Sequence, residues 1–257
     1  MSENDPSGQV EDSRAKAYSQ YVSTHTAPPD RKIYKSQTQW FPVLRHIPAD
    51  RGLRVLDLGC GDGSLLKELL ALGYKNIYGI DTSSEQIASA RLRGIDCVEA
   101  ADAFGFLKSG GANRWDVILL VDVLEHFSID EAVQVFELVE FALAPDGTVI
   151  AQSPNSTSPF FGRYAYGDLT HRSVYTESSA KQLARLAGLT PVAVHAVPVA
   201  PGGGPGRAAR RVAFHVVKKL YQFALSAESG PQMNAVVSQN LILEARKIQG
   251  IKDSYDT

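Results

Sequence analysis

A glycine-rich turn between two apolar segments constrains this 257-residue chain more than any other feature. The first segment predicts a buried strand over 53–58, and Gly59, Gly61 and Gly63 follow it directly. Glycines let the backbone turn sharply and pass close to a ligand where any Cβ atom would collide. A helix predicted over 64–72 then directs its first amide groups at the same place. The pattern therefore predicts a nucleotide-binding turn.

Acidic residues follow the next two predicted strands. Asp81 ends the strand expected over 76–81, where a second parallel strand offers a carboxylate to ribose hydroxyls. Asp102 follows the strand expected over 95–100, and its carboxylate and the backbone near Ala103 are suited to an adenine edge. Capping the next helix is an alternative role for Asp102, and it is compatible with ligand contact.

Strands and helices alternate along the chain, which predicts an α/β, Rossmann-like doubly wound fold with helices on both faces of a mostly parallel sheet. Further strands are expected over 116–122, 147–153, 191–199 and 240–247. Further helices are expected over 84–93, capped by Ser83 or Ser84, over 130–143, with Asp130 at its start, and over 177–187. We expect one domain over 51–257 and an N-terminal extension over 1–50, in which 18–34 forms either a lid or a packed anchor.

Four ordered motifs resemble those of class I S-adenosylmethionine-dependent methyltransferases. They are Val55-Leu-Asp-Leu-Gly-Cys-Gly-Asp-Gly63, Gly79-Ile-Asp81, Ala101-Asp-Ala103 and Asp116-Val-Ile-Leu-Leu-Val-Asp-Val-Leu-Glu-His126. A dinucleotide-binding dehydrogenase shares the strand, turn and acid. Its fingerprint, however, needs glycine or alanine where this chain has Ser64.

The resemblance implies a seven-stranded sheet with an antiparallel last strand inserted beside the sixth. It also implies S-adenosylmethionine as the cofactor. The implied cofactor-binding residues are Asp57, Gly59, Gly61, Asp81, Asp102, Ala103 and, near the amino group of the ligand, Asp122.

Titratable side chains follow the apolar run over 116–122. Asp122, Glu125 and His126 share a spacing that resembles the metal-binding loop of quinol O-methyltransferases. Such a set could hold Mg²⁺ and lower the pKa of an acceptor hydroxyl. Many related enzymes carry Leu-Glu-His here without a metal, so both alternatives stay open. Helix capping or backbone hydrogen bonding is a third role for Glu125 and His126.

A second polar loop follows the strand expected over 147–153. Its segment Tyr166–Thr176 resembles one found in methyltransferases of bacterial cell-surface glycan and glycolipid pathways. There His171 is a candidate base, favoured over His126, while Arg163, Asp168 and Arg172 are candidates to grip sugar hydroxyls or a phosphate. In the alternative interpretation, His171 and Asp168 only hold the loop in place.

Composition excludes several classes of partner. The net charge of −2 gives no nucleic-acid signature, and the Asp/Asn-Pro-Pro-aromatic motif of amino-methylating enzymes is absent after the fourth strand. The two cysteines predict no structural disulfide, because Cys60 lies inside the glycine turn, and this fits a reducing cytoplasm. No apolar run approaches the roughly 20 residues that span a bilayer.

A basic amphipathic helix is expected over 207–225, within an insertion near 201–239. Its apolar stripe contains Phe214, Val217, Tyr221 and Leu225, and its basic side contains Arg207, Arg211, His215, Lys218 and Lys219. Such a helix suits peripheral contact with the anionic inner face of a membrane. Packing on the sheet edge or on a second subunit is the alternative.

These features predict an O-methyltransferase that acts on a hydroxyl of a sugar, glycolipid or related natural product, including a small-molecule or lipid-linked glycan acceptor. One alternative is a metal-assisted methyltransferase of quinols or other small molecules. Another is a non-catalytic S-adenosylmethionine-binding subunit.

Overall fold

A computed structural model describes residues 37–198 and 204–248. Their core is a seven-stranded sheet with the order β3-β2-β1-β4-β5-β7-β6. The strands are β1 (Arg54–Leu58), β2 (Asn76–Asp81), β3 (Val98–Ala100), β4 (Trp115–Val121), β5 (Leu143–Pro154), β6 (Thr190–Ala196) and β7 (Asn240–Arg246). The helices are α3 (Gln37–Leu44), α4 (Ser64–Ala71), α5 (Ser84–Leu92), α6 (Ala103–Gly110), η1 (Leu124–His126), α7 (Ile129–Ala142), α8 (Phe161–Ala165), α9 (Glu177–Leu186) and α10 (Gly204–Ser229).

The topology confirms the expected fold. β1, β2, β3, β4 and β5 pair in parallel, whereas β7 lies between β5 and β6 and is antiparallel to both. The chain order reverses between β1 and β4, which are neighbours in the sheet. Such a switch point opens a crevice at the carboxyl ends of the strands, where ligands bind in open α/β sheets.

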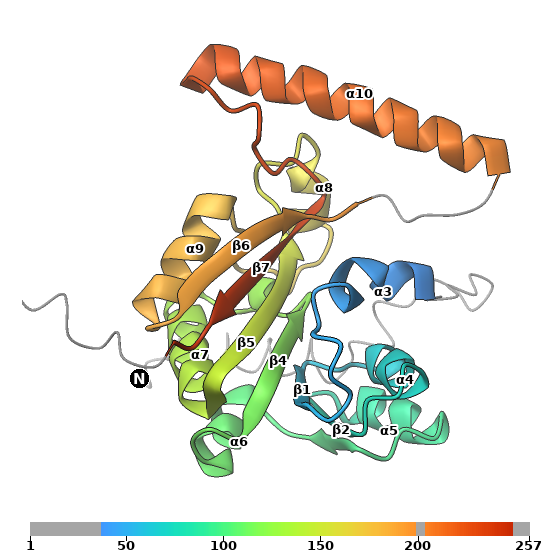
Figure 1. Cartoon of the computed structure of the whole chain (residues 1–257), viewed down its shortest axis with the longest axis vertical. Helices are drawn as coiled ribbons and strands as arrows, with labels where there is room; N and C mark the ends of the chain where they lie inside the picture. Colours follow the sequence, from blue (N-terminus) through green and yellow to red (C-terminus); the bar gives the residue numbers. More distant parts are fainter. Residues whose placement is uncertain (1–36, 199–203, 249–257) are drawn as a thin grey trace, which may run out of the picture.

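Each face of the sheet is covered by its own helices (Figure 1). Alternate residues of β4 point to opposite faces, so Ile118 and Leu120 enter one hydrophobic cluster while Val117 and Leu119 enter the other. The first cluster is completed by α6, α7 and α9, and the second by α3, α4 and α5. Because both faces are buried, β4 is apolar throughout its centre rather than alternating.

Two details of the sequence prediction were wrong. Ser128, not Asp130, caps α7: its hydroxyl accepts a hydrogen bond from Glu131 N, and the Glu131 carboxylate accepts one from Ser128 N. Asp130 already lies within the first helical turn, where its side chain cannot take the capping position. β3 is shorter than expected, because Ile95 belongs to the turn that ends α5, where Ile95 N donates to Ala90 O at 3.1 Å.

The long helix α10 lies across the top of Figure 1, beyond the end of the sheet. Phe214, Tyr221 and Leu225 are partly covered, as the predicted stripe requires, but Val217 is 46 % exposed. Gln222 anchors the helix to the following segment by donating to Ala235 O at 2.8 Å. The segment 18–34, predicted as lid or anchor, lies outside the described residues.

Candidate active site

The glycine turn after β1 has the conformation that the sequence predicts. Gly59 and Gly61 have φ values of 76° and 53°, in the left-handed region that favours glycine. A Cβ atom on Gly59 would lie 2.3 Å from Cγ2 of Val123, whereas one on Gly61 would meet nothing within 4 Å. The turn is therefore closed on one side by protein and open on the other, where a ligand can approach the backbone.

Asp81 is held over this turn by backbone amides. Its Oδ2 atom accepts a hydrogen bond from Gly61 N at 2.9 Å, and its Oδ1 atom accepts one from Ser83 N at 2.8 Å. Burial raises the pKa of Asp81, and these two hydrogen bonds oppose the rise. Each carboxylate oxygen can accept more than one hydrogen bond, so both retain capacity for the hydroxyls of a ribose.

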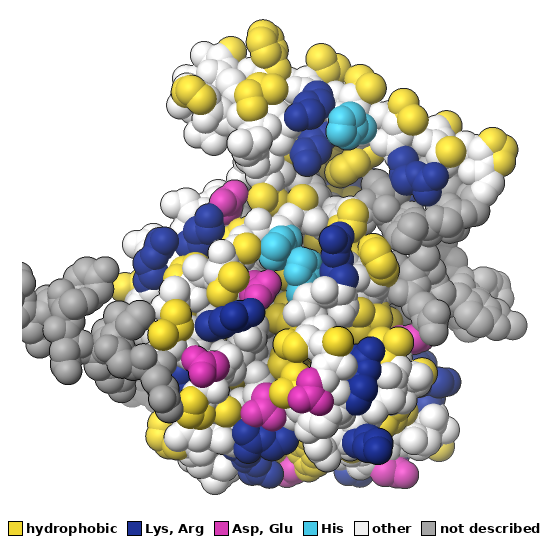
Figure 2. Space-filling view, viewed as in Figure 1, with side chains coloured by type: hydrophobic (Ala, Val, Ile, Leu, Met, Phe, Trp, Pro, Cys, Tyr) yellow, Lys and Arg dark blue, Asp and Glu magenta, His cyan; other side chains and the backbone are white. Residues whose placement is uncertain are grey.

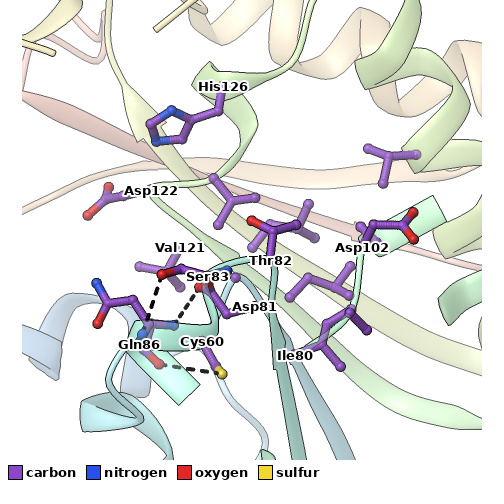
Figure 3. Close-up of a pocket in the computed structure, with 18 of the residues that line it drawn as sticks. Cys60, Ile80, Asp81, Thr82, Ser83, Gln86, Asp102, Val121, Asp122 and His126 are labelled. Atoms are coloured by element: carbon purple, nitrogen blue, oxygen red, sulfur yellow. Dashed lines mark hydrogen bonds between the residues drawn. The ribbon is translucent and has the colours of Figure 1, made fainter. Parts of the chain in front are cut away.

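A cavity of about 790 Å³ opens at these strand ends (Figure 3). Seven predicted site residues line it: Gly59, Gly61, Asp81, Asp102, Ala103, Asp122 and His126. Asp57, Glu125 and His171 are not among the lining residues. The volume suits a nucleoside-sized ligand together with a small acceptor.

Asp102 combines the two roles left open by the sequence. It caps α6, where its Oδ1 atom accepts a hydrogen bond from Gly105 N at 2.8 Å, and it lines the cavity.

Asp57 lies deeper, with 2 % of its surface exposed. Burial, reinforced by the charge of Asp81, raises its pKa to about 7.

Several lining residues were missed as ligand contacts by the sequence analysis. Thr82 and Gln86 follow Asp81, so their place after a strand end was a usable signal. Phe104 lies in the first turn of α6 and makes an edge-to-face contact with Phe127 at 5.7 Å between ring centroids. Trp40 reaches the cavity from α3, and nothing in its local sequence distinguishes a lining aromatic residue from a core one.

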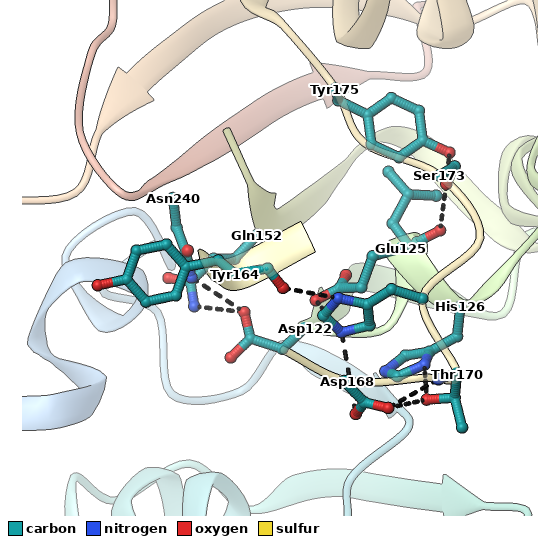
Figure 4. Close-up of polar contacts among 12 residues, drawn as sticks. Asp122, Glu125, His126, Gln152, Tyr164, Asp168, Thr170, Ser173, Tyr175 and Asn240 are labelled. Carbon is teal, nitrogen blue, oxygen red and sulfur yellow. Dashed lines mark hydrogen bonds and ion pairs between the residues drawn. The ribbon is translucent and has the colours of Figure 1, made fainter. Parts of the chain in front are cut away.

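A second part of the cavity wall begins at Asp122, directly after β4. Asp122 has a φ of 57°, and its Oδ1 atom accepts hydrogen bonds from Gln152 Nε2 at 3.0 Å and Asn240 Nδ2 at 3.2 Å (Figure 4). The neighbouring strands β5 and β7 therefore fix the orientation of this carboxylate.

His126 is connected to Asp168 through one hydroxyl group. Thr170 Oγ1 lies 2.6 Å from Asp168 Oδ1 and 2.9 Å from His126 Nδ1 (Figure 4). The carboxylate only accepts, so Thr170 donates its proton to Asp168 and accepts one from His126 Nδ1–H. This arrangement assigns the neutral ring its Nδ1–H tautomer and places the basic lone pair on Nε2.

His171 packs edge-to-face against His126, with ring centroids 4.9 Å apart. Its Nδ1–H donates to the carbonyl of Tyr164 at 2.9 Å. Its Nε2 atom lies 3.9 Å from Glu125 Oε1 and 4.0 Å from Asp168 Oδ2. His171 therefore lies between two acids behind His126, which is the histidine on the cavity wall.

Glu125 is buried, with 1 % of its surface exposed. Burial, followed by the charge of Asp122, raises its pKa well above the usual value. Ligand atoms of Glu125, His126 and His171 lie within 4.8 Å of one another, and Asp122 is not in this group. Two imidazoles and one carboxylate do not match the oxygen ligands that Mg²⁺ prefers, so the predicted magnesium site fits these residues poorly.

Residues 168–173 are fastened to the η1 segment. Arg172 N and Ser173 N both donate to Glu125 O, at 2.8 Å and 3.1 Å. The Arg172 guanidinium pairs with Glu131 at 2.6 Å. Asp168 and Arg172 thus have structural partners, as in the loop-holding interpretation.

A family model described as "Methyltransferase domain" matches residues 33–194. Curated relatives include proteins named ubiquinone biosynthesis O-methyltransferase. The one from Caulobacter sp. (strain K31) is 30 % identical over 110 residues, which cover 41 % of this chain and 42 % of the relative. The one from Xylella fastidiosa (strain 9a5c) is 32 % identical over 123 residues, covering 46 % and 48 %. The chain thus spans less than half the length of these relatives.

Solved structures with a similar fold include a SAM-dependent methyltransferase from Archaeoglobus fulgidus, with a TM-score of 0.62 and 20 % identity, covering 83 % of this chain and 96 % of that one. Another is the 1,6-didemethyltoxoflavin-N1-methyltransferase of Burkholderia thailandensis, solved with S-adenosylhomocysteine. Its TM-score is 0.59 at 19 % identity, and the match covers 96 % of this chain and 92 % of that one.

Proposed function

Since the chain belongs to the S-adenosylmethionine-dependent methyltransferases, we propose that it transfers the methyl group to a hydroxyl of a small, lipid-soluble acceptor. When bound, S-adenosylmethionine supplies a methyl group on a sulfonium, ready for in-line displacement. The turn at Gly59 and Gly61 and the carboxylates of Asp81 and Asp102 would hold it at the strand ends. The protein then has to orient the acceptor, exclude water and remove one proton.

The observation that carries this proposal is the chain of contacts from Asp168 through Thr170 to His126. An acceptor hydroxyl must lose its proton as the new bond forms, so a base must face the cavity. His126 lines the cavity, and its contact at Nδ1 leaves Nε2 as the basic atom that would take the proton. We therefore assign the base to His126 and a positioning role to His171, although the sequence favoured the reverse order.

A phenolic hydroxyl of the quinol type is the acceptor class we favour. The curated relatives are named for O-methylation in ubiquinone biosynthesis. Two of the three residues expected to grip a sugar, Asp168 and Arg172, are engaged with Thr170 and Glu131 instead. Sugar hydroxyls are the second class, supported by the resemblance of Tyr166–Thr176 to glycan methyltransferases.

Methyl transfer from labelled S-adenosylmethionine tests both acceptor classes. We expect turnover with a prenylated catechol or hydroquinone, and little with nucleotide-activated sugars. His126→Gln should lower kcat by roughly 10²–10⁴ while cofactor affinity is retained. His215→Gln, a change at an exposed histidine of α10, is the matched control. Intact cofactor binding without turnover on any acceptor would contradict the proposal and favour the non-catalytic subunit.

Treatment with a chelator distinguishes methyl transfer without a metal from metal-assisted methyl transfer. We expect turnover to persist after treatment with EDTA, because Asp122 lies outside the group formed by Glu125, His126 and His171, which offers only one carboxylate. Loss of turnover that Mg²⁺ restores would instead support the metal-assisted alternative.

We also propose that α10 brings the protein to an anionic membrane surface. Within the described residues, no helix is both long enough and apolar enough to cross a bilayer. The outer face of α10 is nevertheless apolar: Val212, Val216, Leu220 and Phe223 are 65 %, 52 %, 64 % and 68 % exposed. Their spacing of three and four residues places them on one side of the helix, and Figure 2 shows hydrophobic side chains along its outer edge.

The basic residues of α10 favour an anionic membrane as the partner of its exposed apolar face. The sequence of α10 contains five Lys or Arg residues and one Glu, although the whole chain carries a net charge of −2. Helical geometry places Lys219 at one border of the apolar face and Arg210 and Lys218 on the opposite, polar side of the helix. Basic residues beside exposed aliphatic and aromatic groups are typical of helices that lie in a lipid interface, and each contributes about 1 kcal/mol near an anionic surface.

Sedimentation with vesicles tests this location. We expect the protein to pellet with vesicles that contain phosphatidylglycerol but not with phosphatidylcholine alone. The double change Leu220→Asp and Phe223→Asp should weaken binding more than tenfold, whereas Leu186→Asp, at a residue of α9 that is 61 % exposed, should leave it unchanged. Equal binding by the double variant, or a dimer that the double change dissociates, would contradict a membrane role.

A further inference from the structure

A second group of metal-ligand side chains lies outside the methyl-transfer site. His46 follows α3, His195 lies near the end of β6, and Glu244 lies on β7. One ligand atom from each of the three side chains lies within 4.8 Å of the others. The group therefore joins the segment before β1 to the far edge of the sheet, and nothing in the proposed reaction uses it.

The two imidazoles lie directly against each other. Their centroids are 4.1 Å apart and their planes meet at 29°, a stacked geometry. The stacking holds two rings, each with nitrogen atoms that can serve as metal ligands, in one place.

The Nε2 atom of His195 is the observation that indicates a cation site. It is buried and makes no hydrogen bond within the described part of the chain. Glu244 Oε2 lies 3.5 Å away, which is long for an N–H···O hydrogen bond. The other Glu244 oxygen, Oε1, accepts from Arg246 Nη2 at 3.4 Å. Buried polar atoms are normally satisfied, and a coordinated cation would satisfy this one.

We propose that His46, His195 and Glu244 bind one divalent transition-metal ion, with Zn²⁺ as the best match. Two imidazole nitrogens and a carboxylate oxygen are zinc ligands, whereas Mg²⁺ and Ca²⁺ prefer oxygen alone. Arg246 would orient the carboxylate as a neighbouring contact. The ion would fasten the segment after α3 to the β6–β7 edge, and α3 itself carries Trp40, which lines the cavity.

Titration of the chelator-treated full chain with Co²⁺ and Zn²⁺ tests the site. We expect one equivalent to bind, with visible Co²⁺ absorption and a higher Tm. His195→Ala should lower the affinity by more than the roughly 10–100-fold that loss of a supporting contact costs. His126→Ala is the matched control, because Glu125, His126 and His171 form the other potential metal group of the described residues.

Any of three results would contradict the proposed metal site. They are no binding of Co²⁺ or Zn²⁺ by the wild type, full metal affinity in His195→Ala, and loss of metal binding in His126→Ala alone. Retained affinity for S-adenosylmethionine shows that a variant folds. If His195→Ala does not fold, Glu244→Gln replaces it, with the same expected loss of Co²⁺ absorption.

Discussion

The side of the cavity that we propose for the cofactor, the cofactor side, is built from backbone turns and the residues beside them. The side that we propose for the acceptor, the acceptor side, is built from side chains that meet across long stretches of sequence. Gly61 and Asp81, which hydrogen-bond on the cofactor side, are 20 residues apart. Thr170 and His126 are 44 residues apart, and Asn240 and Asp122 are 118 apart. The cofactor side should therefore respond to changes of backbone geometry, and the acceptor side to the loss of single side-chain contacts.

Gly59→Ala should have the largest effect, because the new Cβ would lie 2.3 Å from Val123 and the residue has positive φ. We expect affinity for S-adenosylmethionine to fall at least 100-fold in calorimetry. Gly73→Ala is the control: Gly73 also has positive φ, at 92°, but its Cβ would meet nothing within 4 Å. That variant should lose about 1 kcal/mol of stability and keep the affinity. Equal loss of affinity in both variants would contradict the idea that the geometry of the turn at Gly59 determines cofactor binding.

Asp57→Asn should change how stability depends on pH. The folded pKa of Asp57, about 7, is raised above its unfolded value of about 3.9. The native state then holds the proton more tightly, so this residue makes the free energy of unfolding fall as pH rises from about 4 to 7, by at most about 4 kcal/mol. In urea unfolding measured across this pH range, the free energy of unfolding of Asp57→Asn should lack this decline.

Asp116→Asn is the control for that series. The hydrogen bond from Arg54 lowers the pKa of Asp116. Its contribution is therefore present above the unfolded pKa and lost as pH falls, the opposite sign. A wild-type curve that does not decline between pH 4 and 7 would argue against a buried, protonated Asp57.

Thr170→Val tests the acceptor side, because it keeps the shape of the side chain and removes the hydroxyl between Asp168 and His126. We expect kcat to fall about tenfold, equivalent to about 1.4 kcal/mol, with KM for S-adenosylmethionine unchanged. Thr170→Ser should restore most of the rate, and Thr190→Val on β6 should have no effect. A fall in cofactor affinity instead would show that the two sides are not separate.

Ser128→Ala should have the smallest effect. It removes the hydroxyl that caps α7 and leaves the Glu131 amide without that partner. The expected loss is about 1 kcal/mol of stability, measured as a lower urea midpoint. Ser109→Ala, at an exposed serine of α6, should cost less than half of that. An unchanged midpoint in Ser128→Ala would show that the capping box contributes nothing.

Much of the cofactor side was predictable from sequence. The left-handed turn at Gly59 and Gly61, the carboxylate of Asp81 and the cap at Asp102 follow from local rules that link residue type to backbone conformation. Trp40 was not predictable as a lining residue, because its position depends on how α3 packs against the sheet.

Local residue patterns were enough to predict the alternation of strands and helices, the edge of the sheet at which the cavity opens, and the resemblance to the methyltransferases, because hydrophobic period and glycine conformation are local properties. Three features became visible only in the packed molecule: His126 rather than His171 lines the cavity, Asp122 is held by β5 and β7, and α10 exposes a second apolar face. Each of these depends on distances between segments that are remote in sequence. Those distances are set when the sheet and its helices pack, and no local pattern records them.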